Sequence, residues 1–306
     1  MLAGGVGAAR FLRGLHSLLD PTRLTIIVNT GDDEIFYGLH VSPDVDTIIY
    51  TLAGLVAPTP GWGLRNDSVA CLTALGRFYD ANWFRLGDRD LATHVFRTDA
   101  LRQGKTLSML TGALARAHGV RATVLPMSDD PVRTFVTVAG HSPLPFQEYL
   151  VRRRGRGRVT QITLRGARRA RPAAGVLRAA RQAGAIIIPP SNPLVSIGPI
   201  LALAGMRRAL RATRAPIAAI SPIVAGAPIK GPLHRMLRGL GHEVSPVGVA
   251  RLYRGLADIF VLDQRDTGHA AQIADLGMRP VVTDTLMTTP EKSQRLAATV
   301  LAELRQ

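Results

Sequence analysis

The sequence contains a single cysteine, Cys71, so no disulfide can form within the chain. The apolar helical stretch around this cysteine favours a buried small side chain over a reactive thiol, and we assign it no role. No apolar run approaches the roughly 20 residues that a membrane span requires, and the N-terminus lacks the charged and then apolar layout of a signal peptide. The sequence therefore predicts a cytoplasmic protein without a membrane segment.

Acidic residues are few, at 22 against 38 Lys and Arg residues, which gives a formal net charge of +16. Lysine is scarcer still, and occurs only at positions 105, 230 and 292. Arginines are dense between positions 152 and 171, yet no interleaved aromatic side chains, zinc-ligand spacing or helix-turn-helix pattern accompany them. We interpret this stretch as a solvated face and predict no nucleic-acid partner. RNA binding stays a rival hypothesis, and the excess charge would also attract a polyanionic small substrate.

Runs rich in Val and Ile recur along the chain, and such runs are typical of parallel strands that are buried on both faces. They lie at residues 24–28, 122–125, 185–188, 217–220, 259–262 and 280–282. Amphipathic helical patterns cover residues 176–183, 233–240, 249–256, 270–276 and 290 to about 304, and Thr289 is the expected N-cap of the last helix. We predict a single α/β domain over residues 1–306, with a doubly wound, mostly parallel, Rossmann-like sheet.

Two segments depart from this alternation of strands and helices. Residues 47–118 have a helical pattern with no convincing strand between 50 and 120, and we interpret them as a helical cap. Residues 133–172 contain short alternating runs, at 134–138 and 159–164, around the arginine-rich stretch. We interpret them as an inserted arm, for which a surface hairpin without catalytic duty is the alternative.

A glycine cluster stands almost at the start of the chain. Gly4, Gly5 and Gly7 follow only three residues, so the first strand is expected to be short, or the start of the chain to be shortened. Glycines in a strand-to-helix turn let backbone N–H groups approach an anion, and the helix N-terminus adds partial positive charge. The cluster is not the full dinucleotide fingerprint and lacks a P-loop lysine, so a turn without a ligand stays the alternative to a phosphate site.

Polar, turn-forming residues follow most of the predicted strands. They occupy residues 29–33, 126–131, 189–199, 221–222 and 263–266. Each segment alone has the composition of an ordinary capped turn. Because ligands bind beyond the carboxyl ends of parallel strands, their recurrence predicts a binding site along one edge of the sheet.

Four carboxylates, Asp32, Asp33, Asp44 and Asp46, lie close together in this otherwise basic chain. Neighbouring carboxylates repel unless a cation or a donor separates them, and hard oxygen ligands suit Mg²⁺. The alternative is capping, in which Asp46 opens a helix over residues 47–55 and Asp44 forms an Asx-turn. No second histidine or glutamate accompanies His94 at ligand spacing, so we interpret it as a core or surface histidine.

Short motifs along the whole chain resemble, in order, those of the 2-phospho-L-lactate transferase (CofD) family of coenzyme F(420) biosynthesis. They are AGGVGA at 3–8, VNTGDD at 28–33, GLHVSPDVDT at 38–47, GWGL at 61–64, LGDRD at 86–90, PMSDD at 126–130, PSNP at 190–193, SIGPI at 196–200 and DTLM at 284–287. The sequence also lacks the motifs of a covalent nucleophile or a zinc peptidase. Both observations favour phosphate-centred chemistry by positioning and electrostatics.

The resemblance implies an Mg²⁺-dependent transferase. Such an enzyme moves a phospholactyl or, in the bacterial variant, a phosphoenolpyruvyl group from a guanosine diphosphate-linked donor to the ribityl hydroxyl of the deazaflavin Fo, and releases GMP. The family's deazaflavin-contacting aspartate falls on Asp46, and a second contact, a lysine in some relatives, falls on Arg85.

These observations together give the candidate site. We assign the donor's phosphates and nucleotide to Gly4, Gly5, Gly7, Asn29, Thr30, Ser191, Asn192 and Ser196. Asp44 and Asp46 are assigned to Mg²⁺ and to the orientation of the acceptor hydroxyl, and Arg85 and Arg89 to charge compensation.

Several alternatives stay open at this point. The donor carries either lactate or enolpyruvate, and a homodimer is possible. Asp263 and Asp266 are expected either to contact guanine or to close a turn. A non-catalytic nucleotide or sugar-nucleotide-binding regulator of the same superfamily is the alternative to a transferase, and release of GMP separates the two.

Overall fold

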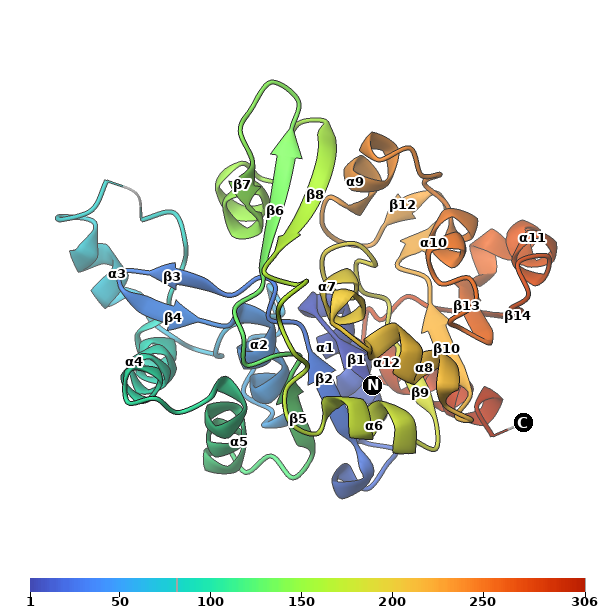
Figure 1. Ribbon diagram of the computed structural model, residues 1–306, viewed down its shortest axis with the longest axis horizontal. Coiled ribbons are helices and arrows are strands. Elements are labelled where there is room, and N and C mark those ends of the chain that lie inside the picture. Colours follow the sequence, from blue (N-terminus) through green and yellow to red (C-terminus); the bar gives the residue numbers. More distant parts are fainter. Residues whose placement is uncertain (81, 306) are drawn as a thin grey trace.

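The computed structural model describes residues 1–80 and 82–305 of the chain (Figure 1). Two parallel sheets lie edge to edge at its centre. The first has the order β1 (Leu2–Ala3), β2 (Thr25–Val28) and β5 (Thr123–Pro126). The second has the order β9 (Ile186–Ile188), β10 (Ile217–Ile220), β13 (Ile259–Asp263) and β14 (Arg279–Thr283). Since β1 lies beside β9, the combined order is β5-β2-β1-β9-β10-β13-β14.

Every Val- and Ile-rich run of the sequence forms one of these parallel strands, which confirms the predicted doubly wound sheet. Strand β10 illustrates why the runs are continuously apolar. Ile217 and Ala219 belong to one buried cluster, whereas Ala218 and Ile220 belong to another. Successive side chains of a strand point to opposite faces, so both faces of this sheet are covered.

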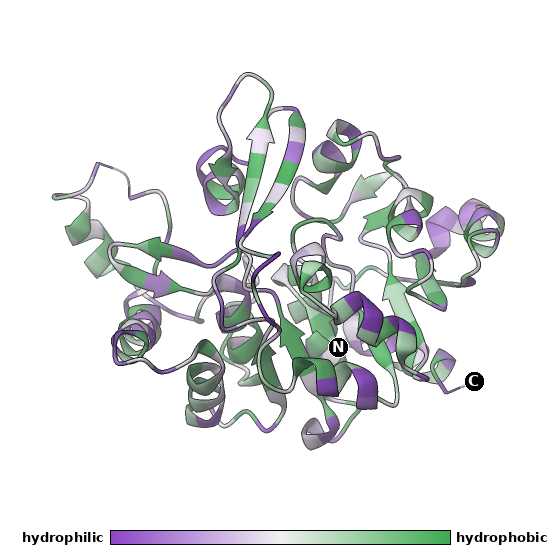
Figure 2. Ribbon diagram, viewed as in Figure 1, coloured by the Kyte–Doolittle hydropathy of each residue, from purple (hydrophilic) through white to green (hydrophobic). Residues whose placement is uncertain are grey.

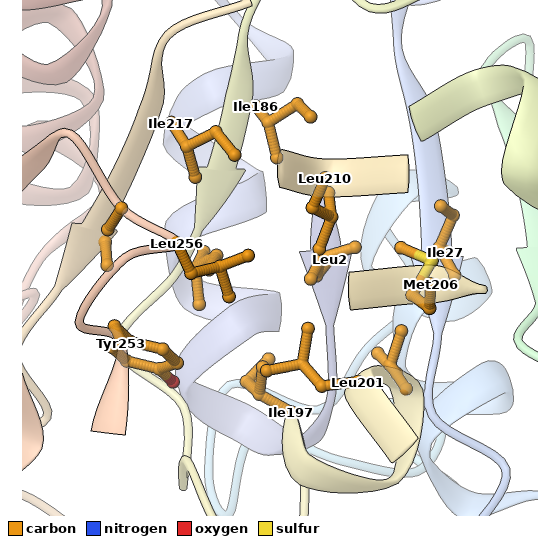
Figure 3. Packing of buried hydrophobic residues seen from close by; sticks show 14 of the residues in the cluster. Leu2, Ile27, Ile186, Ile197, Leu201, Met206, Leu210, Ile217, Tyr253 and Leu256 are labelled. Atoms are coloured by element: carbon orange, nitrogen blue, oxygen red, sulfur yellow. The ribbon is translucent and has the colours of Figure 1, made fainter. Parts of the chain in front are cut away.

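Helices cover the two faces. On one side, α1 (Gly5–His16) packs against α12 (Pro290–Glu303) and α2 (Pro43–Leu52). The other side carries α6 (Val176–Gln182), α7 (Gly198–Ala202), α8 (Met206–Ala212), α9 (Leu233–Gly239), α10 (Pro246–Leu252) and α11 (Ala270–Ala274). Figure 3 shows Met206 and Leu210 of α8 beside strand residues such as Ile217, in the buried cluster that these helices cover. The strands at the centre are hydrophobic, while several helices carry hydrophilic stretches (Figure 2).

The start of α12 is as predicted. The Thr289 hydroxyl accepts a hydrogen bond from the N–H of Lys292 at 3.3 Å, and Pro290 occupies the first turn. A capping hydroxyl of this kind satisfies one of the N–H groups that a helix leaves unpaired at its start. No helix among the described residues is long and apolar enough to cross a membrane.

The helical cap contains most of α2, followed by α3 (Ala70–Leu75), α4 (Asp88–Arg102) and α5 (Leu107–Ala117). The sequence did not predict the hairpin of β3 (Glu34–Phe36) and β4 (Leu39–Val41), because each strand has only three residues. Helix α2 begins at Pro43, so the expectation that Asp46 opens a helix over 47–55 is wrong. Cys71 was expected to be buried, but it is exposed on α3.

The inserted arm is an antiparallel sheet that projects at the top of Figure 1. It contains β6 (Arg133–Val138), β7 (Leu144–Pro145), the short helical turn η2 (Glu148–Arg152) and β8 (Val159–Arg165). Val136 and Val159 form a small buried cluster with Val195 and Met236, which anchors the arm to the loop after β9 and to α9. A second small hairpin, β11 (Ile223–Val224) and β12 (Ala227–Pro228), follows β10.

The order of the strands reverses between β1 and β9, and open α/β sheets bind ligands at such a point. The two loops that leave these strands touch. Ser191 Oγ donates a hydrogen bond to the carbonyl oxygen of Gly4 at 2.7 Å. At Gly7 an added Cβ would lie 2.2 Å from the carbonyl oxygen of Pro190, so a side chain there would force the two backbones apart.

The substitution Gly7→Ala is therefore expected to lower the free energy of unfolding by about 1–3 kcal/mol, because the new methyl group must displace the Pro190 backbone. Gly112→Ala on α5 is the matched control, since only Arg116 Nη1 lies near, at 3.4 Å. The control should be neutral or stabilise by about 0.4–1 kcal/mol. Urea unfolding followed by circular dichroism measures both, and equal midpoints would contradict the close contact.

Candidate functional site

A cavity of about 490 Å³ lies where the loops after β1 and β9 meet. The helical cap, the inserted arm and residues 222–233 complete its walls. Most of the site residues that the sequence predicted line this one cavity, namely Gly4, Gly5, Gly7, Asp44, Asp46, Arg85, Ser191, Asn192 and Ser196. Asn29, Thr30 and Arg89 are not part of its lining.

The glycine turn forms one wall of the cavity. Gly5 has a φ of 70°, a conformation that glycine adopts without strain. An added Cβ at Gly4 would lie 2.8 Å from Cβ of Ser196, so this position has no room for a side chain. The N-cap residue Gly4 offers no capping side chain, and the N–H groups that follow Gly5 in the first turn of α1 are free to meet an anion.

Asp44 ties the glycine turn to α2. Its Oδ1 accepts a hydrogen bond from the N–H of Gly5 at 2.8 Å, and its Oδ2 accepts one from Asn29 Nδ2 at 2.9 Å. The Asx-turn considered for Asp44 is therefore not what holds this side chain. Asn29 and Thr30 are buried, at 0% and 3% exposure, so they lie behind the wall rather than on it. Asn29 contributes to the site by its hydrogen bond to the Asp44 carboxylate.

Asp32 is a second carboxylate in the lining, and it is 6% exposed. Burial and the neighbouring charges of Asp44 and Asp33 raise the pKa of Asp32 well above its usual range. Burial also raises the pKa of Asp44, to about 6. Asp32 Oδ1 has no hydrogen-bond partner among the described residues. Two buried carboxylates that repel each other beside a phosphate-sized turn fit a divalent cation.

Asp46 is held from the opposite side by a buried arginine. Arg97 is 0% exposed, and its Nη2 donates a hydrogen bond to Asp46 Oδ1, while its Nη1 donates to the carbonyl oxygen of His40 at 3.2 Å. Burial raises the pKa of Asp46, and the Arg97 guanidinium opposes that shift. Asp46 Oδ2 lacks a hydrogen-bond partner within the described chain.

Asp90 and His94 on α4 extend the group around Asp46. Tyr50 donates a hydrogen bond to Asp90 Oδ1 at 2.7 Å, and His94 Nε2 lies 3.5 Å from the same oxygen. His94 Nδ1 lies 3.7 Å from Asp46 Oδ2, and one ligand atom from each of Asp46, Asp90 and His94 falls within 4.8 Å of the others. This set was not predicted from the sequence, because no glutamate or second histidine accompanies His94 at ligand spacing. The spacing of Asp90 and His94, one helical turn apart, was the available signal.

Three cations line the cavity, namely Arg10, Arg85 and Lys230. Arg89, which the sequence analysis assigned to charge compensation, is exposed and lies outside the lining. Its N–H donates to Asp67 Oδ1 at 2.8 Å, which fixes the start of α4 rather than a cavity wall. A catalytic role for Arg89 stays a prediction that this placement does not favour.

Polar side chains in the loop after β9 form hydrogen bonds within the loop and to the glycine turn. Asn192 Oδ1 accepts a hydrogen bond from the N–H of Leu194 at 2.9 Å, and Ser191 Oγ donates one to the carbonyl oxygen of Gly4.

Asp263 and Asp266 accept hydrogen bonds from backbone groups of other loops. Asp263 Oδ2 accepts from the N–H of Thr285 at 2.9 Å, and Asp266 accepts from the N–H of Ala225. Since neither Asp263 nor Asp266 lines the cavity, the turn-closing alternative fits both.

Comparison with known proteins gives a consistent result. A family model described as 2-phospho-L-lactate transferase CofD matches residues 1–303. The 2-phospho-L-lactate transferase of Methanosarcina acetivorans is 39% identical over 302 residues, which covers 98% of this chain and 97% of that protein. The phosphoenolpyruvate transferase of Kitasatospora aureofaciens is 42% identical over 312 residues and covers 100% and 97%.

The fold also resembles a solved structure. A member of the UPF0052 family from Bacillus halodurans matches with a TM-score of 0.66 and 16% sequence identity, over 98% of this chain and 97% of that chain. At this level of identity the match supports the α/β fold alone.

The buried pair gives a stability prediction. Arg97→Met should lower the free energy of unfolding by about 3–5 kcal/mol, because it leaves the Asp46 carboxylate buried without its partner. Arg121→Met is the matched control, since the pair of Arg121 with Asp20 is 66% and 52% exposed and should contribute less than about 1 kcal/mol. Urea unfolding measures both. The assignment fails if Arg97→Met costs no more than Arg121→Met.

Proposed function

The chain belongs to the 2-phospho-L-lactate transferase CofD family, and from this premise we propose its reaction. The enzyme transfers a phospholactyl or phosphoenolpyruvyl group from a guanosine diphosphate-linked donor to the terminal ribityl hydroxyl of the deazaflavin Fo. GMP is released, and the product enters the biosynthesis of coenzyme F(420). One observation carries the proposal, which is that a glycine turn at a helix N-terminus, buried carboxylates and aromatic side chains line a single cavity.

In this proposal the donor's phosphates lie against the glycine turn. The N–H groups at the start of α1 donate hydrogen bonds to the phosphate oxygens, and the helix dipole adds favourable charge. Ser196 is placed across the turn from Gly4, where its hydroxyl is available to the same group. Ser191 and Asn192 act mainly by keeping the loop after β9 against Gly4.

The family implies a divalent cation, and the donor set of this chain fits one. Asp32 and Asp44 would hold Mg²⁺, because both are buried carboxylates in the lining and Asp32 Oδ1 has no hydrogen-bond partner in the described part of the chain. When bound, the cation neutralises negative charge on the phosphate oxygens. This pair differs from the pair Asp44 and Asp46 of the sequence analysis, since Asp46 is already paired with Arg97.

The acceptor is proposed to occupy the side of the cavity with aromatic and apolar walls. Trp62, Phe84, Phe146 and Met287 line it and offer flat or apolar surface to a tricyclic ring. Arg85 lies in the same lining, where the family resemblance assigns a contact with the deazaflavin.

Asp46 orients the acceptor hydroxyl by accepting its hydrogen bond. The hydroxyl oxygen then attacks the phosphorus that carries the transferred group, and a new P–O bond forms. The hydroxyl proton passes to the Asp46 carboxylate, whose Oδ2 has no hydrogen-bond partner in the described part of the chain. The bond from this phosphorus to the bridging oxygen breaks, and that oxygen leaves with the electron pair on GMP. Such a transfer depends on alignment and charge stabilisation and needs no covalent nucleophile.

The reaction is tested by product identification. The purified protein is incubated with Fo, Mg²⁺ and each of the two donors in turn, and the products are identified by mass. We expect GMP and a phospholactyl or phosphoenolpyruvyl derivative of Fo, and loss of turnover when the cation is chelated. A nucleotide-binding regulator would release no GMP from either donor, and that result would refute the proposal.

Asp46→Asn should lower kcat by at least about 100-fold, on the order of 2.7 kcal/mol in barrier, because the acceptor hydroxyl loses its orienting carboxylate. Asp99→Asn is the control, since Asp99 is an exposed residue of helix α4 outside the cavity lining and should leave kcat unchanged. Unchanged affinity for GDP verifies that the variant keeps its donor site. Turnover near that of the unmodified protein would remove Asp46 from the mechanism.

A further inference from the structure

None of the three cations in the cavity has an anionic partner within the part of the chain that the structure describes. Arg85 is assigned to the acceptor in the proposed function, which leaves Arg10 and Lys230. Arg10 and Lys230 both line the cavity, and neither has a carboxylate within 4 Å among residues 1–80 and 82–305. The buried Arg97, in contrast, is paired with Asp46, and Lys292 is paired with Asp284 at 2.9 Å. Unpaired cations that face one cavity attract an anionic ligand.

Arg10 and Lys230 share this cavity lining, and their charges repel each other. Partial desolvation and the charge of Arg10 lower the pKa of Lys230. Lys230 Nζ donates one hydrogen bond, to the carbonyl oxygen of Pro60 at 2.7 Å, so two of its three N–H groups remain for a ligand. The repulsion between two like charges would be relieved by an oxyanion that accepts from both.

The position of Arg10 on α1 relates this pair to the donor's phosphates. Arg10 follows Val6 by one helical turn, on the same face of α1. Val6 contacts Gly61, since a Cβ added at Gly61 would lie 2.8 Å from Val6 Cγ1. The Arg10 side chain is therefore about 6 Å further along the helix than the first turn. That offset suits a second anionic group that is attached close to the phosphate held by the turn.

Arg10 and Lys230, but not Arg85, come from segments that carry none of the carboxylates of the lining. The carboxylates of Asp32, Asp44, Asp46 and Asp90 come from the end of β2, from α2 and from α4. Arg10 and Lys230 come from α1 and from the segment after β12. A ligand with a cation on one side and a free carboxylate on the other matches this division.

We propose that Arg10 and Lys230 form an oxyanion subsite that binds the carboxylate of the group being transferred. The inference rests on the proposed function, because lactate and enolpyruvate both carry such a carboxylate beside the reacting phosphorus. The subsite fixes the transferred group while the glycine turn fixes the diphosphate. It therefore distinguishes the complete donor from GDP, which lacks the carboxylate.

The test compares the affinity for the complete donor with the affinity for GDP by titration calorimetry in the absence of Fo. Lys230→Gln and Arg10→Gln should each weaken donor binding about ten- to hundredfold, the loss expected for a hydrogen-bonded charge, and change GDP binding less than about threefold. Lys230→Arg should restore most of the donor affinity. Lys105→Gln is the control, because Lys105 is exposed and lies outside the cavity lining.

Each outcome decides a separate question. Equal weakening of donor and GDP would overturn the carboxylate assignment, because the pair would then bind the diphosphate. Unchanged affinity for both ligands would overturn the subsite altogether. If the unmodified protein binds neither donor nor GDP, the proposed function itself fails. Retained GDP affinity and an unchanged melting temperature show that each variant has folded.

Discussion

The close contact between the loops after β1 and β9 is the constraint on which the site depends. Gly7 leaves room for the Pro190 carbonyl group, and Gly4 leaves room for Ser196, so two backbones meet where ordinary side chains would separate them. Gly5 then turns its N–H toward Asp44, which places a carboxylate of α2 next to the start of α1. The order of the strands brings these loops together, and the small residues let them touch.

Burial of carboxylates is the second constraint, and the protein meets it in two ways. Asp46 is compensated within the chain, because Arg97 is buried beside it and donates to its carboxylate. Asp32 and Asp44 have no such cation beside them within the described chain, and burial together with the charge of Asp44 raises the pKa of Asp32. Buried charge of one sign is unfavourable, so this pair would gain stability from a cation while Asp46 has little need of one.

The sequence predicted the central sheet closely and the site in part, for a physical reason. Strand β10 agrees with its predicted bounds because a run that is buried on both faces is apolar without interruption. Asn29 was placed correctly after a strand, but no sequence pattern says that its amide turns inward to Asp44. No pattern in the sequence marks Arg97 as buried, because its partner Asp46 lies 51 positions earlier. Contacts between distant segments of this kind have no local signal in the sequence.

The charges on the cavity walls favour one form of a phosphate ligand over another. A free diphosphate near Asp32 and Asp44 would meet like charge in a poorly solvated place, and the strong net positive charge of the chain does not cancel that local repulsion. A diphosphate that carries a divalent cation meets the same carboxylates with the opposite sign. Under the proposed function, the acidic wall would select the cation complex over the free anion, whereas the helix N-terminus alone would accept either. Electrostatic selection of this kind would explain why a strongly basic protein keeps buried carboxylates at the place where an anion is expected to bind.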